Sequence, residues 1–436
     1  MTDDMKIIHD PVHGNIKVNG VFLDILDRHE MQRLRSVKQL DFGYLVFPGA
    51  NHTRFEHSLG VYHLAGSMAD AIGLSEKDSM TVRAAGMLHD ICHAPYSHTL
   101  EEIIEERTGL DHMGLARKLI KGKIRTYRQQ DEDLFGSTGP ISELLEKEGI
   151  DSDLVCDLIA YPVSKNKGLE DFGKNAHHSY FPSKDYAHQI IHGPVDADQM
   201  DYLVRDAHYT GVSLGMIDIE RLLSTMRVFN DRIVIERGGS AAAEGLMVSR
   251  SLMYTSVYYH KTVRIAKTMI TKAVEASALD VSDAYTWSDS DLIEALTEEG
   301  GIPSRLARSV QNRMLYKNVL TKFSEDTNDE TAKLLAQYSK YRERKQLEQE
   351  VADKAGVDIS EVAIDMPSSS TLLSKINIGK TNVSILDDGK VRSLTRTSPI
   401  AKALQARDTF GWSIIVSAPR SSSEAVRRAV KKVLNL

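Results

Sequence analysis

The stretch "RFEHSLGVYHLAGSMAD", residues 54–70, decides the fold expected for this chain. Its apolar residues recur at the spacing of a helix, and Glu56 and His57 stand where that helix should begin. A second stretch, "AAGMLHDICHAPYSH" at residues 84–98, places His89-Asp90 at the end of another apolar helix. These residues indicate either a polar seam in a helical core or a metal site built from distant segments.

The composition is that of an ordinary globular protein. The chain has 436 residues, 42% of them hydrophobic and 26% charged, and this length predicts two or three domains. A net charge of −7 argues against a nucleic-acid-binding surface over the whole protein. Cys92 and Cys156 are too few for a disulfide framework. The acidic N-terminus lacks an apolar core, and no run of about 18 apolar residues occurs, so we expect no signal peptide, no membrane span and a cytoplasmic location.

Helical periodicity covers residues 20–120 and returns at 193–211, where Pro194 is expected near the first turn. Residues 121–186 are less regular and contain a polar, glycine-bearing stretch typical of a surface insertion or lid. The other expected elements are a hairpin at 227–239, a long helix at 244–277, charged helices at 310–365, a hairpin at 381–394, a strand at 412–420 and a helix at 421–436. The predicted fold class is mainly α, with parts at 1–300, 301–365 and 366–436, the last a small α+β region.

Two histidine–aspartate pairs occur in different surroundings. His9-Asp10 precedes Pro11 in extended chain, and it is not expected to bind a metal. His89-Asp90 follows the apolar segment "TVRAAGML", where a buried charge needs a partner or a metal. The second pair is therefore the candidate for chemistry.

Imidazole and carboxylate ligands together suit Mn²⁺, Fe²⁺, Zn²⁺ or Ni²⁺ better than Ca²⁺. His57 offers a third ligand from the preceding helix, and Asp198 in "DADQMDY" offers a fourth. Asp198 shares one helix face with Tyr202 and Asp206, because the three recur at intervals of four residues. Spacing alone supports a metal site and a polar core seam about equally, since scattered ligands are less diagnostic than a compact zinc motif.

Longer motifs carry a resemblance to a known family. They are "DPVHGNIKV", "MQRLRSVKQLDFGYLVFPGANHTRFEHSLGV", "LHDICHAPYSHTLEE" and "DADQMDYLVRDAHYTGV". The chain resembles the deoxynucleoside triphosphate triphosphohydrolases of the sterile-alpha-motif/HD type from about residue 6 to 270, and more loosely beyond. No sterile-alpha-motif domain is expected before the matched region. The resemblance implies that residues 1–300 form an HD-type catalytic domain with an N-terminal regulatory segment.

The resemblance also implies roles for individual residues. The implied metal ligands are His57, His89, Asp90 and Asp198, around a divalent ion such as Mn, Fe, Zn, Ni or Mg. The implied catalytic residues are Arg54, His93, His98, Glu101 and His112, with His112 as the acid that protonates the departing 5′-oxygen. The implied substrate contacts are Gln39, Leu40, Arg54, Gln199, Tyr202, Asp206, Arg250, Tyr254 and Tyr258. This chain departs from the family at three positions. Glu101 replaces the usual aspartate, Gln199 replaces a lysine, and Tyr254 replaces a histidine.

An activator site is implied in the same way. Its matched residues are Lys6, Ile7, Asp27, Gln32, Arg35, Val46, Arg221, His260, Lys261, Arg313 and Lys317. In the family such sites lie between the subunits of a tetramer, so a homotetramer and a GTP or dGTP activator, with magnesium-bound nucleotides, are expected. For Asp27, Gln32 and Arg35, a solvated helix face is the simpler alternative.

The reaction implied by the resemblance is hydrolysis of a dNTP to a deoxynucleoside and tripolyphosphate. One alternative is a nucleotide phosphatase or phosphodiesterase on the same metal centre, which the changes at Gln199 and Tyr254 favour. A less favoured alternative is a nucleic-acid-binding protein that uses the basic segments "KGKIRTYR" and "RRAVKK".

Overall fold

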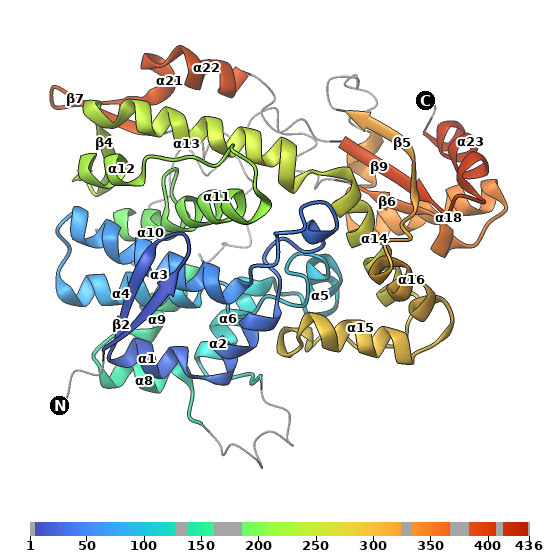
Figure 1. Cartoon of the computed structure of the whole chain (residues 1–436), viewed down its shortest axis with the longest axis horizontal. Coiled ribbons are helices and arrows are strands. Elements are labelled where there is room, and N and C mark those ends of the chain that lie inside the picture. Colours follow the sequence, from blue (N-terminus) through green and yellow to red (C-terminus); the bar gives the residue numbers. More distant parts are fainter. Residues whose placement is uncertain are drawn as a thin grey trace.

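The computed structural model describes residues 5–126, 138–160, 185–323, 334–366, 383–406 and 413–434. The described chain is mainly helical, with small sheets, which confirms the predicted fold class. A larger helical body contains the N-terminal half, and a smaller lobe carries β5, β9, β6, α18 and α23 beside it (Figure 1).

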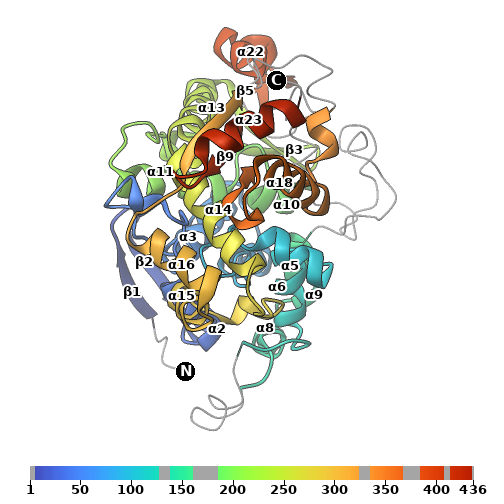
Figure 2. The ribbon, with the colours of Figure 1, turned by 90° about the vertical axis from the view of Figure 1, so that its right-hand side faces the viewer.

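The chain begins with a hairpin. Its strands β1 (Met5–Asp10) and β2 (Gly14–Asn19) pair antiparallel and lie along the outside of the helical body (Figure 2). Short helices follow at α1 (Val21–Leu26) and α2 (His29–Arg33). The segment from Leu34 to Thr53 contains two short 3-10 turns and leads directly into α3.

Three helices position the candidate site: α3 (Arg54–Ala71), α4 (Glu76–Leu88) and α11 (Ala197–Thr210). Helix α3 begins at a capping box, in which Thr53 and Glu56 satisfy each other's backbone amides. Most of α3 is buried, as expected for a helix that is apolar on several faces. Gly60 lets α11 approach closely, because an added Cβ there would lie 1.8 Å from Oδ1 of Asp201.

Further helices surround this centre. They are α5 (Glu101–Thr108), α6 (His112–Ile120), α8 (Ile141–Lys147), α9 (Ser152–Ile159), α10 (Asp185–His192), α12 (Ile219–Thr225), α13 (Ser240–Met253), α14 (Lys261–Glu275), α15 (Asp289–Glu298) and α16 (Gly301–Gln311). The expected surface insertion at 121–186 is wrong for helices α8 and α9. Leu145 in α8 and Cys156 in α9 are fully buried in the main core. The polar stretch expected to form a lid lies almost wholly outside the described residues.

Two sheets lie toward the C-terminal half. One has the order β3-β4-β7-β8, from strands Met226–Phe229, Arg232–Glu236, Ser384–Asp387 and Lys390–Ser393. Both of its predicted hairpins are confirmed, and left-handed φ angles of 49° at Asn230 and 58° at Asp231 make the first turn. The second sheet, in the small lobe, has the order β5-β9-β6, from Lys317–Phe323, Ser413–Ala418 and Ala363–Asp365. Helices α18 (Tyr341–Ala355) and α23 (Ser423–Val433) pack on it, whereas α21 (Leu394–Thr397) and α22 (Pro399–Ala406) follow β8.

Two local predictions are wrong. The segment 310–365 is not helical throughout, because β5 pairs with β9 and β6 pairs with β9 on its other edge. The helix expected at 244–277 is broken by a π-helical turn at Tyr254–Tyr258. Pro194 lies just before α11, whose N-cap is Asp196, so it stands near the first turn as expected. The two differences come from tertiary contacts that residue periodicity does not encode.

The described residues form two hydrophobic cores. The larger core runs through α1, α3, α4, α9, α11, α13 and α14, and the smaller one fills the lobe of β5, β9, β6, α18 and α23. Within the described ranges, no helix combines the length and the apolar character needed to cross a bilayer.

Candidate metal centre and active site

Four predicted ligands meet between α3, α4 and α11. The ligand atoms of His57, His89 and Asp90 all lie within 4.8 Å of one another. Asp198, on the first turn of α11, places Oδ1 3.1 Å from Nε2 of His57 and 3.8 Å from Nε2 of His89. The Asp198 side chain is 27% exposed, whereas the His89 side chain is 7% exposed, so the centre opens on the Asp198 side.

The donor set fits a divalent cation. Nδ1 of His89 bonds the carbonyl oxygen of Gly86 at 2.8 Å, which leaves Nε2 facing the centre. This Nε2 is buried and has no hydrogen-bond partner among the described residues, although Oδ1 of Asp90 lies 3.4 Å away. Two imidazoles and two carboxylates suit a transition-metal ion, and an unpaired buried nitrogen among them is a site for such a ligand bond.

Electrostatics around His57 point the same way. Burial lowers the pKa of His57, but hydrogen bonds to Asp198 and Asp201 outweigh it and raise the pKa to about 10. Burial raises the pKa of Asp90, but the positive charge of Arg54 and the two neighbouring histidines holds it well below its usual range. The carboxylates around His57 therefore favour positive charge at this point, which a bound divalent cation would supply.

A chain of buried charges supports His57 from behind. Nδ1 of His57 bonds Oδ2 of Asp201 at 2.7 Å, so its Nε2 faces the centre. Arg205 donates to both oxygens of Asp201 at 2.9 Å, and its third nitrogen bonds Oδ2 of Asp10 at 2.8 Å. His13 also bonds Asp201, at 2.7 Å. Asp10 thus holds Arg205 in place, and Arg205 in turn holds Asp201 against His57.

Asp201, Arg205, His13 and Asp10 are not among the predicted site residues. Asp201 and Arg205 follow Asp198 by three and seven residues. This spacing indicates that all three residues share one face of a helix, so the sequence did contain evidence for them. The partnership of Asp10 with Arg205 joins segments 195 residues apart, and no local pattern indicates it.

Arg54 lies beside the metal centre. Its guanidinium bonds Oδ2 of Asp90, while Nε donates to Oγ of Ser97 at 2.8 Å and Nη2 lies 3.2 Å from Nε2 of His98. The side chain is buried, so its charge acts in a medium of low dielectric constant. A planar guanidinium held in this way is suited to bind a phosphate oxygen.

Glu101 holds two histidines at the edge of the centre. Oε1 bonds Nδ1 of His112 at 2.6 Å, and Oε2 bonds Nδ1 of His98 at 2.8 Å. Burial lowers the pKa of His112, but the hydrogen bond to Glu101 raises it more, so the net shift is upward. Burial and the charges of Arg54 and His112 hold the pKa of His93 well below its usual range. Glu101 therefore orients both imidazole rings, although the family usually carries the shorter aspartate at this position.

His93 and His112 lie face to face, and their pKa values are shifted in opposite directions. Their rings stack at 4.1 Å with 22° between the planes, and Nε2 of His93 lies 3.1 Å from Oδ1 of Asp90. Asp90, His93 and His112 together have the spacing of a second metal group. Nearly parallel stacked rings do not direct their lone pairs at one point, however, so these two histidines are poorly arranged to share a second ion.

Several of the predicted substrate contacts gather around Asp206. The hydroxyl of Tyr258 donates to Oδ2 of Asp206 at 2.7 Å, and Nε2 of His52 lies 2.8 Å from Oδ1. The ring of Tyr202 meets that of Tyr258 edge to face at 5.8 Å. The backbone amide of Gln39 bonds the carbonyl oxygen of His52, which brings the segment of Gln39 and Leu40 to the same region.

Gln199 is a correction to the predicted substrate contacts. Its side chain is fully buried, and its amide nitrogen donates to the carbonyl oxygen of Gly193 at 2.9 Å and to Asp196 at 2.7 Å. It therefore fastens the turn before α11 and does not present its amide NH₂ to a phosphate. Tyr254 and Arg250 do lie together, with the guanidinium 5.6 Å from the ring centroid, and Tyr254 packs edge to face on Tyr258 at 5.0 Å.

The predicted activator residues fall into separate surface groups. Lys6 lies 3.1 Å from Asp27, and Arg35 donates to Gln32 at 2.8 Å, in the region of exposed Ile7. Around the segment that contains Val46, Arg313 donates to the carbonyl oxygen of Leu45 at 3.0 Å and the His260 ring lies 5.9 Å from that of Phe47. Two further predicted activator residues lie close in sequence to His260 and Arg313. Lys261 is the first residue of α14, and Lys317 is the first residue of β5. Arg221 stands elsewhere, with Nε bonded to the carbonyl oxygen of Gly238 at 3.0 Å.

A helical core that brings His57, His89-Asp90 and Asp198 to one buried point defines the class of metal-binding HD phosphohydrolases. The HD domain model matches residues 54–206, and the model of the HD associated region matches residues 217–436. The chain belongs to the HD-domain family, with an HD associated region after the catalytic helices, and the resemblance to the sterile-alpha-motif/HD type is confirmed.

Several relatives share this organisation. An uncharacterized protein of Methanocaldococcus jannaschii is 32% identical over 431 residues, which cover 97% of this chain and 81% of that protein. The human deoxynucleoside triphosphate triphosphohydrolase SAMHD1 is 30% identical over 334 residues, covering 72% of this chain. That match spans only 49% of the human protein, or about half its length.

Solved structures agree with the fold. A hypothetical protein from Aquifex aeolicus aligns with a TM-score of 0.66 at 26% identity, covering 98% of this chain and 100% of that one. A structure titled as a phosphohydrolase from Bacteroides thetaiotaomicron aligns with a TM-score of 0.68 over 96% of this chain. At 22% identity, the second match speaks for the fold alone.

Proposed function

We propose that this protein is a metal-dependent dNTP triphosphohydrolase, which converts a dNTP and water to a deoxynucleoside and tripolyphosphate. One observation carries the proposal: the four candidate ligands lie beside both the guanidinium of Arg54, which bonds Asp90, and the imidazole of His112, which bonds Glu101. The relatedness to triphosphohydrolases at 30% identity supports the choice of reaction within the class.

His57, His89, Asp90 and Asp198 would hold the ion, which neutralises phosphate charge and lowers the pKa of water when it is bound. Arg54 binds an oxygen of the α-phosphate and is kept in place by Asp90 and Ser97. Water attacks the α-phosphorus, the bond from phosphorus to the 5′-oxygen breaks, and the tripolyphosphate leaves with the added oxygen. His112 gives its proton to the 5′-oxygen, because the hydrogen bond to Glu101 raises the pKa of His112 and favours its protonated form.

Asp206 and Tyr258 would select the sugar. The Asp206 carboxylate is buried and already oriented by Tyr258 and His52, so it can accept a hydrogen bond from a 3′-hydroxyl at little cost in ordering. Tyr202 and Tyr258 form an edge-to-face wall beside it. Such a wall rejects a 2′-hydroxyl by steric contact and favours a deoxynucleotide.

Activation by GTP or dGTP in a homotetramer is part of the proposal. Lys6, Asp27, Gln32 and Arg35 form one exposed group that offers both a phosphate-binding cation and a purine-binding carboxylate. Arg313 and His260 form another. Magnesium-bound nucleotides between subunits would join such groups and stabilise the assembled state by binding to it preferentially. A cytoplasmic location remains a prediction from the sequence.

A nucleotide phosphatase or phosphodiesterase on the same centre is the second candidate. It is favoured by Gln199, whose amide is used inside the protein, so this position supplies no cation for a triphosphate. Loss of one phosphate contact would weaken the preference for a triphosphate over a shorter ester.

Product analysis separates these functions. Purified protein is incubated with each dNTP and Mn²⁺, with and without GTP or dGTP, and the products are resolved by ion-exchange chromatography. Deoxynucleoside and tripolyphosphate in equal amounts are expected. Release of dNMP with pyrophosphate, or of dNDP with phosphate, contradicts the proposal and favours the second candidate.

A further inference from the structure

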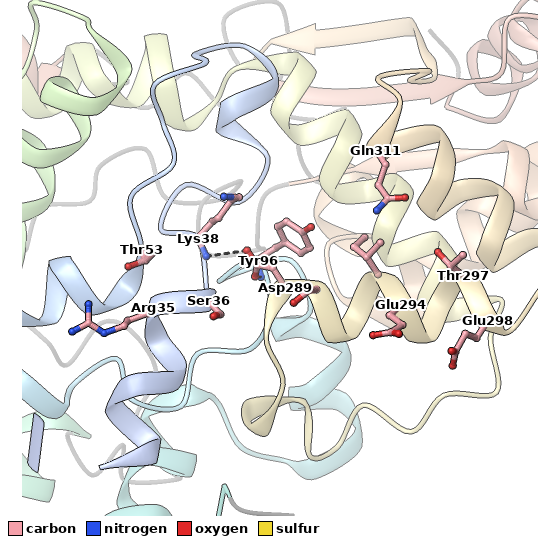
Figure 3. Close-up of a pocket in the computed structure, with 12 residues that line it drawn as sticks. Arg35, Ser36, Lys38, Thr53, Tyr96, Asp289, Glu294, Thr297, Glu298 and Gln311 are labelled. Atoms are coloured by element: carbon pink, nitrogen blue, oxygen red, sulfur yellow. Dashed lines mark hydrogen bonds between the residues drawn. The ribbon is translucent and has the colours of Figure 1, made fainter. Parts of the chain in front are cut away.

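Asp289, the first residue of α15, lies outside the matched HD domain and yet reaches the segments that hold Arg54. A cavity of about 760 Å³ lies between this helix and the segment of Arg35 and Lys38. Figure 3 shows Asp289 at the edge of the cavity beside Lys38 and Tyr96, whereas Glu294 and Glu298 lie farther along α15. Asp289 therefore bridges α15 to the catalytic half of the protein.

Its carboxylate accepts two backbone amides from distant segments. Oδ2 accepts the amide of Lys38 at 3.0 Å, and Oδ1 accepts the amide of Tyr96 at 2.6 Å. The side chain is only 7% exposed, so both bonds are protected from water. A single carboxylate thus fixes the spacing between the Lys38 segment and the Tyr96 segment.

The Tyr96 segment is strained and needs such support. Tyr96 and Ser97 have φ angles of 51° and 52°, in the left-handed region that side chains other than glycine rarely adopt. The Tyr96 ring stacks on Phe42 at 4.1 Å, and its amide is bound by Asp289. Strained backbone of this kind persists where surrounding contacts determine it, and it is frequent near active sites.

The strained turn delivers the Ser97 hydroxyl to Arg54. Ser97 donates to the carbonyl oxygen of Lys38 at 2.7 Å and accepts from Nε of Arg54 at 2.8 Å. Both segments fixed by Asp289 therefore meet at this hydroxyl. The amide of Arg54 also donates to the carbonyl oxygen of Val37 at 2.9 Å, next to Lys38.

We propose that Asp289 is a positioning residue, which sets the Arg54 guanidinium against Asp90 through the amides of Lys38 and Tyr96 and the hydroxyl of Ser97. The proposal deepens the proposed function, on which it rests, because it assigns to the HD associated region a direct part in forming the phosphate-binding site. Asp289 touches neither substrate nor metal in this assignment.

The simpler explanation is that Asp289 only supports the fold. Burial raises the pKa of Asp289 to about 7, although the amides of Tyr96 and Lys38 offset part of that effect. The folded state then binds more protons than the unfolded one between the ordinary pKa and 7, so stability falls as the pH rises through this range. A charged carboxylate at this place thus costs stability above pH 7, and the two explanations are separated by measuring kcat per bound metal.

Asp291 on the same helix gives a matched control. It accepts the amide of Ser288 at 2.7 Å in the capping box of α15 and has no role in holding Lys38 or Tyr96. Asp289→Asn and Asp291→Asn are compared with the wild type in the full-length protein. The measurements are bound Mn²⁺, kcat per bound Mn²⁺ and KM for a dNTP, and amide hydrogen exchange at residues 38 and 96.

Asp289→Asn is expected to lower kcat per bound metal by about tenfold or more, since a small misplacement of a phosphate-binding group has effects of this size. Faster exchange of the two amides should accompany it, while metal content and the Asp291→Asn variant stay near wild type. If kcat per bound metal agrees within about twofold in all three proteins, the proposal is overturned.

A second variant tests the proposal if the Asp289→Asn protein does not fold. Ser97→Ala removes the hydroxyl between Lys38 and Arg54 and should show the same loss of kcat, whereas wild-type turnover in it would overturn the proposal. A wild-type protein without dNTP hydrolysis would instead contradict the proposed function. In that case the same comparison is made with bis(p-nitrophenyl) phosphate, a general phosphohydrolase probe.

Discussion

Replacing Asp201 by asparagine tests the support behind the metal centre. Each oxygen of Asp201 accepts two donors: Oδ2 faces His57 and Nε of Arg205, and Oδ1 faces His13 and Nη2 of Arg205. Asparagine has one oxygen and one NH₂ group at the same positions. In either orientation its NH₂ group points at two donors, so two hydrogen bonds are lost without a change of volume.

The expected magnitude follows from burial. Arg205 and Asp201 are fully buried, and breaking a buried ion pair by neutralising one partner typically costs about 3–5 kcal/mol of stability. His57 also loses the acceptor that directs its Nε2 to the centre. Losing such support typically weakens metal affinity by about 10–100-fold, which corresponds to about 1.4–2.8 kcal/mol.

Two measurements check these values separately. Urea unfolding of metal-free protein gives the change in stability without a contribution from metal binding. Competition with a chelator gives the change in Mn²⁺ affinity. Asp70→Asn is the control, because Asp70 is 71% exposed and pairs with Arg83 at 3.4 Å on the surface. If Asp201→Asn matches this control in both measurements, within about 0.5 kcal/mol, the argument for the buried support is refuted.

Three further predictions concern the chemistry and its control. Asp90→Ala should abolish hydrolysis and reduce bound metal, measured by elemental analysis, and full metal-dependent activity in it would exclude Asp90 as a ligand. Glu101→Gln should lower the pKa of His112, because the Glu101 carboxylate raises it, and so should move the alkaline limb of the kcat–pH profile to lower pH. An unmoved limb would show that His112 is not the acid. Asp27→Ala should impair stimulation of dATP hydrolysis by GTP or dGTP while leaving bound metal unchanged, and light scattering should show a smaller assembly. A wild type that is monomeric and indifferent to guanine nucleotides would show that these residues do not regulate.

Local sequence was informative where local physics decides structure. The hairpin at Asn230-Asp231 follows from residues that tolerate left-handed φ angles, as does the turn at Asp388-Gly389, with φ angles of 48° and 72°. The helix at Arg54–Ala71 follows from its periodicity and from the capping box that Thr53 and Glu56 form. These features depend on neighbours within a few residues.

Strand pairing over long separations was not predictable in the same way. β5 lies in a charged segment expected to be helical, and its strand form depends on β9, about a hundred residues later. β7 pairs parallel with β4, with Ile385 opposite Ile235. The free energy of such strands comes from partners that the local pattern does not identify.

The sequence by itself determined the helical class, the family and the four candidate ligands, because long motifs around His57, His89-Asp90 and Asp198 carry that information within single segments. Only the tertiary structure decided which charges support those ligands. Asp201 and Arg205 reach Asp10 across the fold, and Asp289 binds two amides from segments 251 and 193 residues away. The physical reason is that a buried charge is defined by the groups that surround it in space, and burial and partners exist only once the chain has folded.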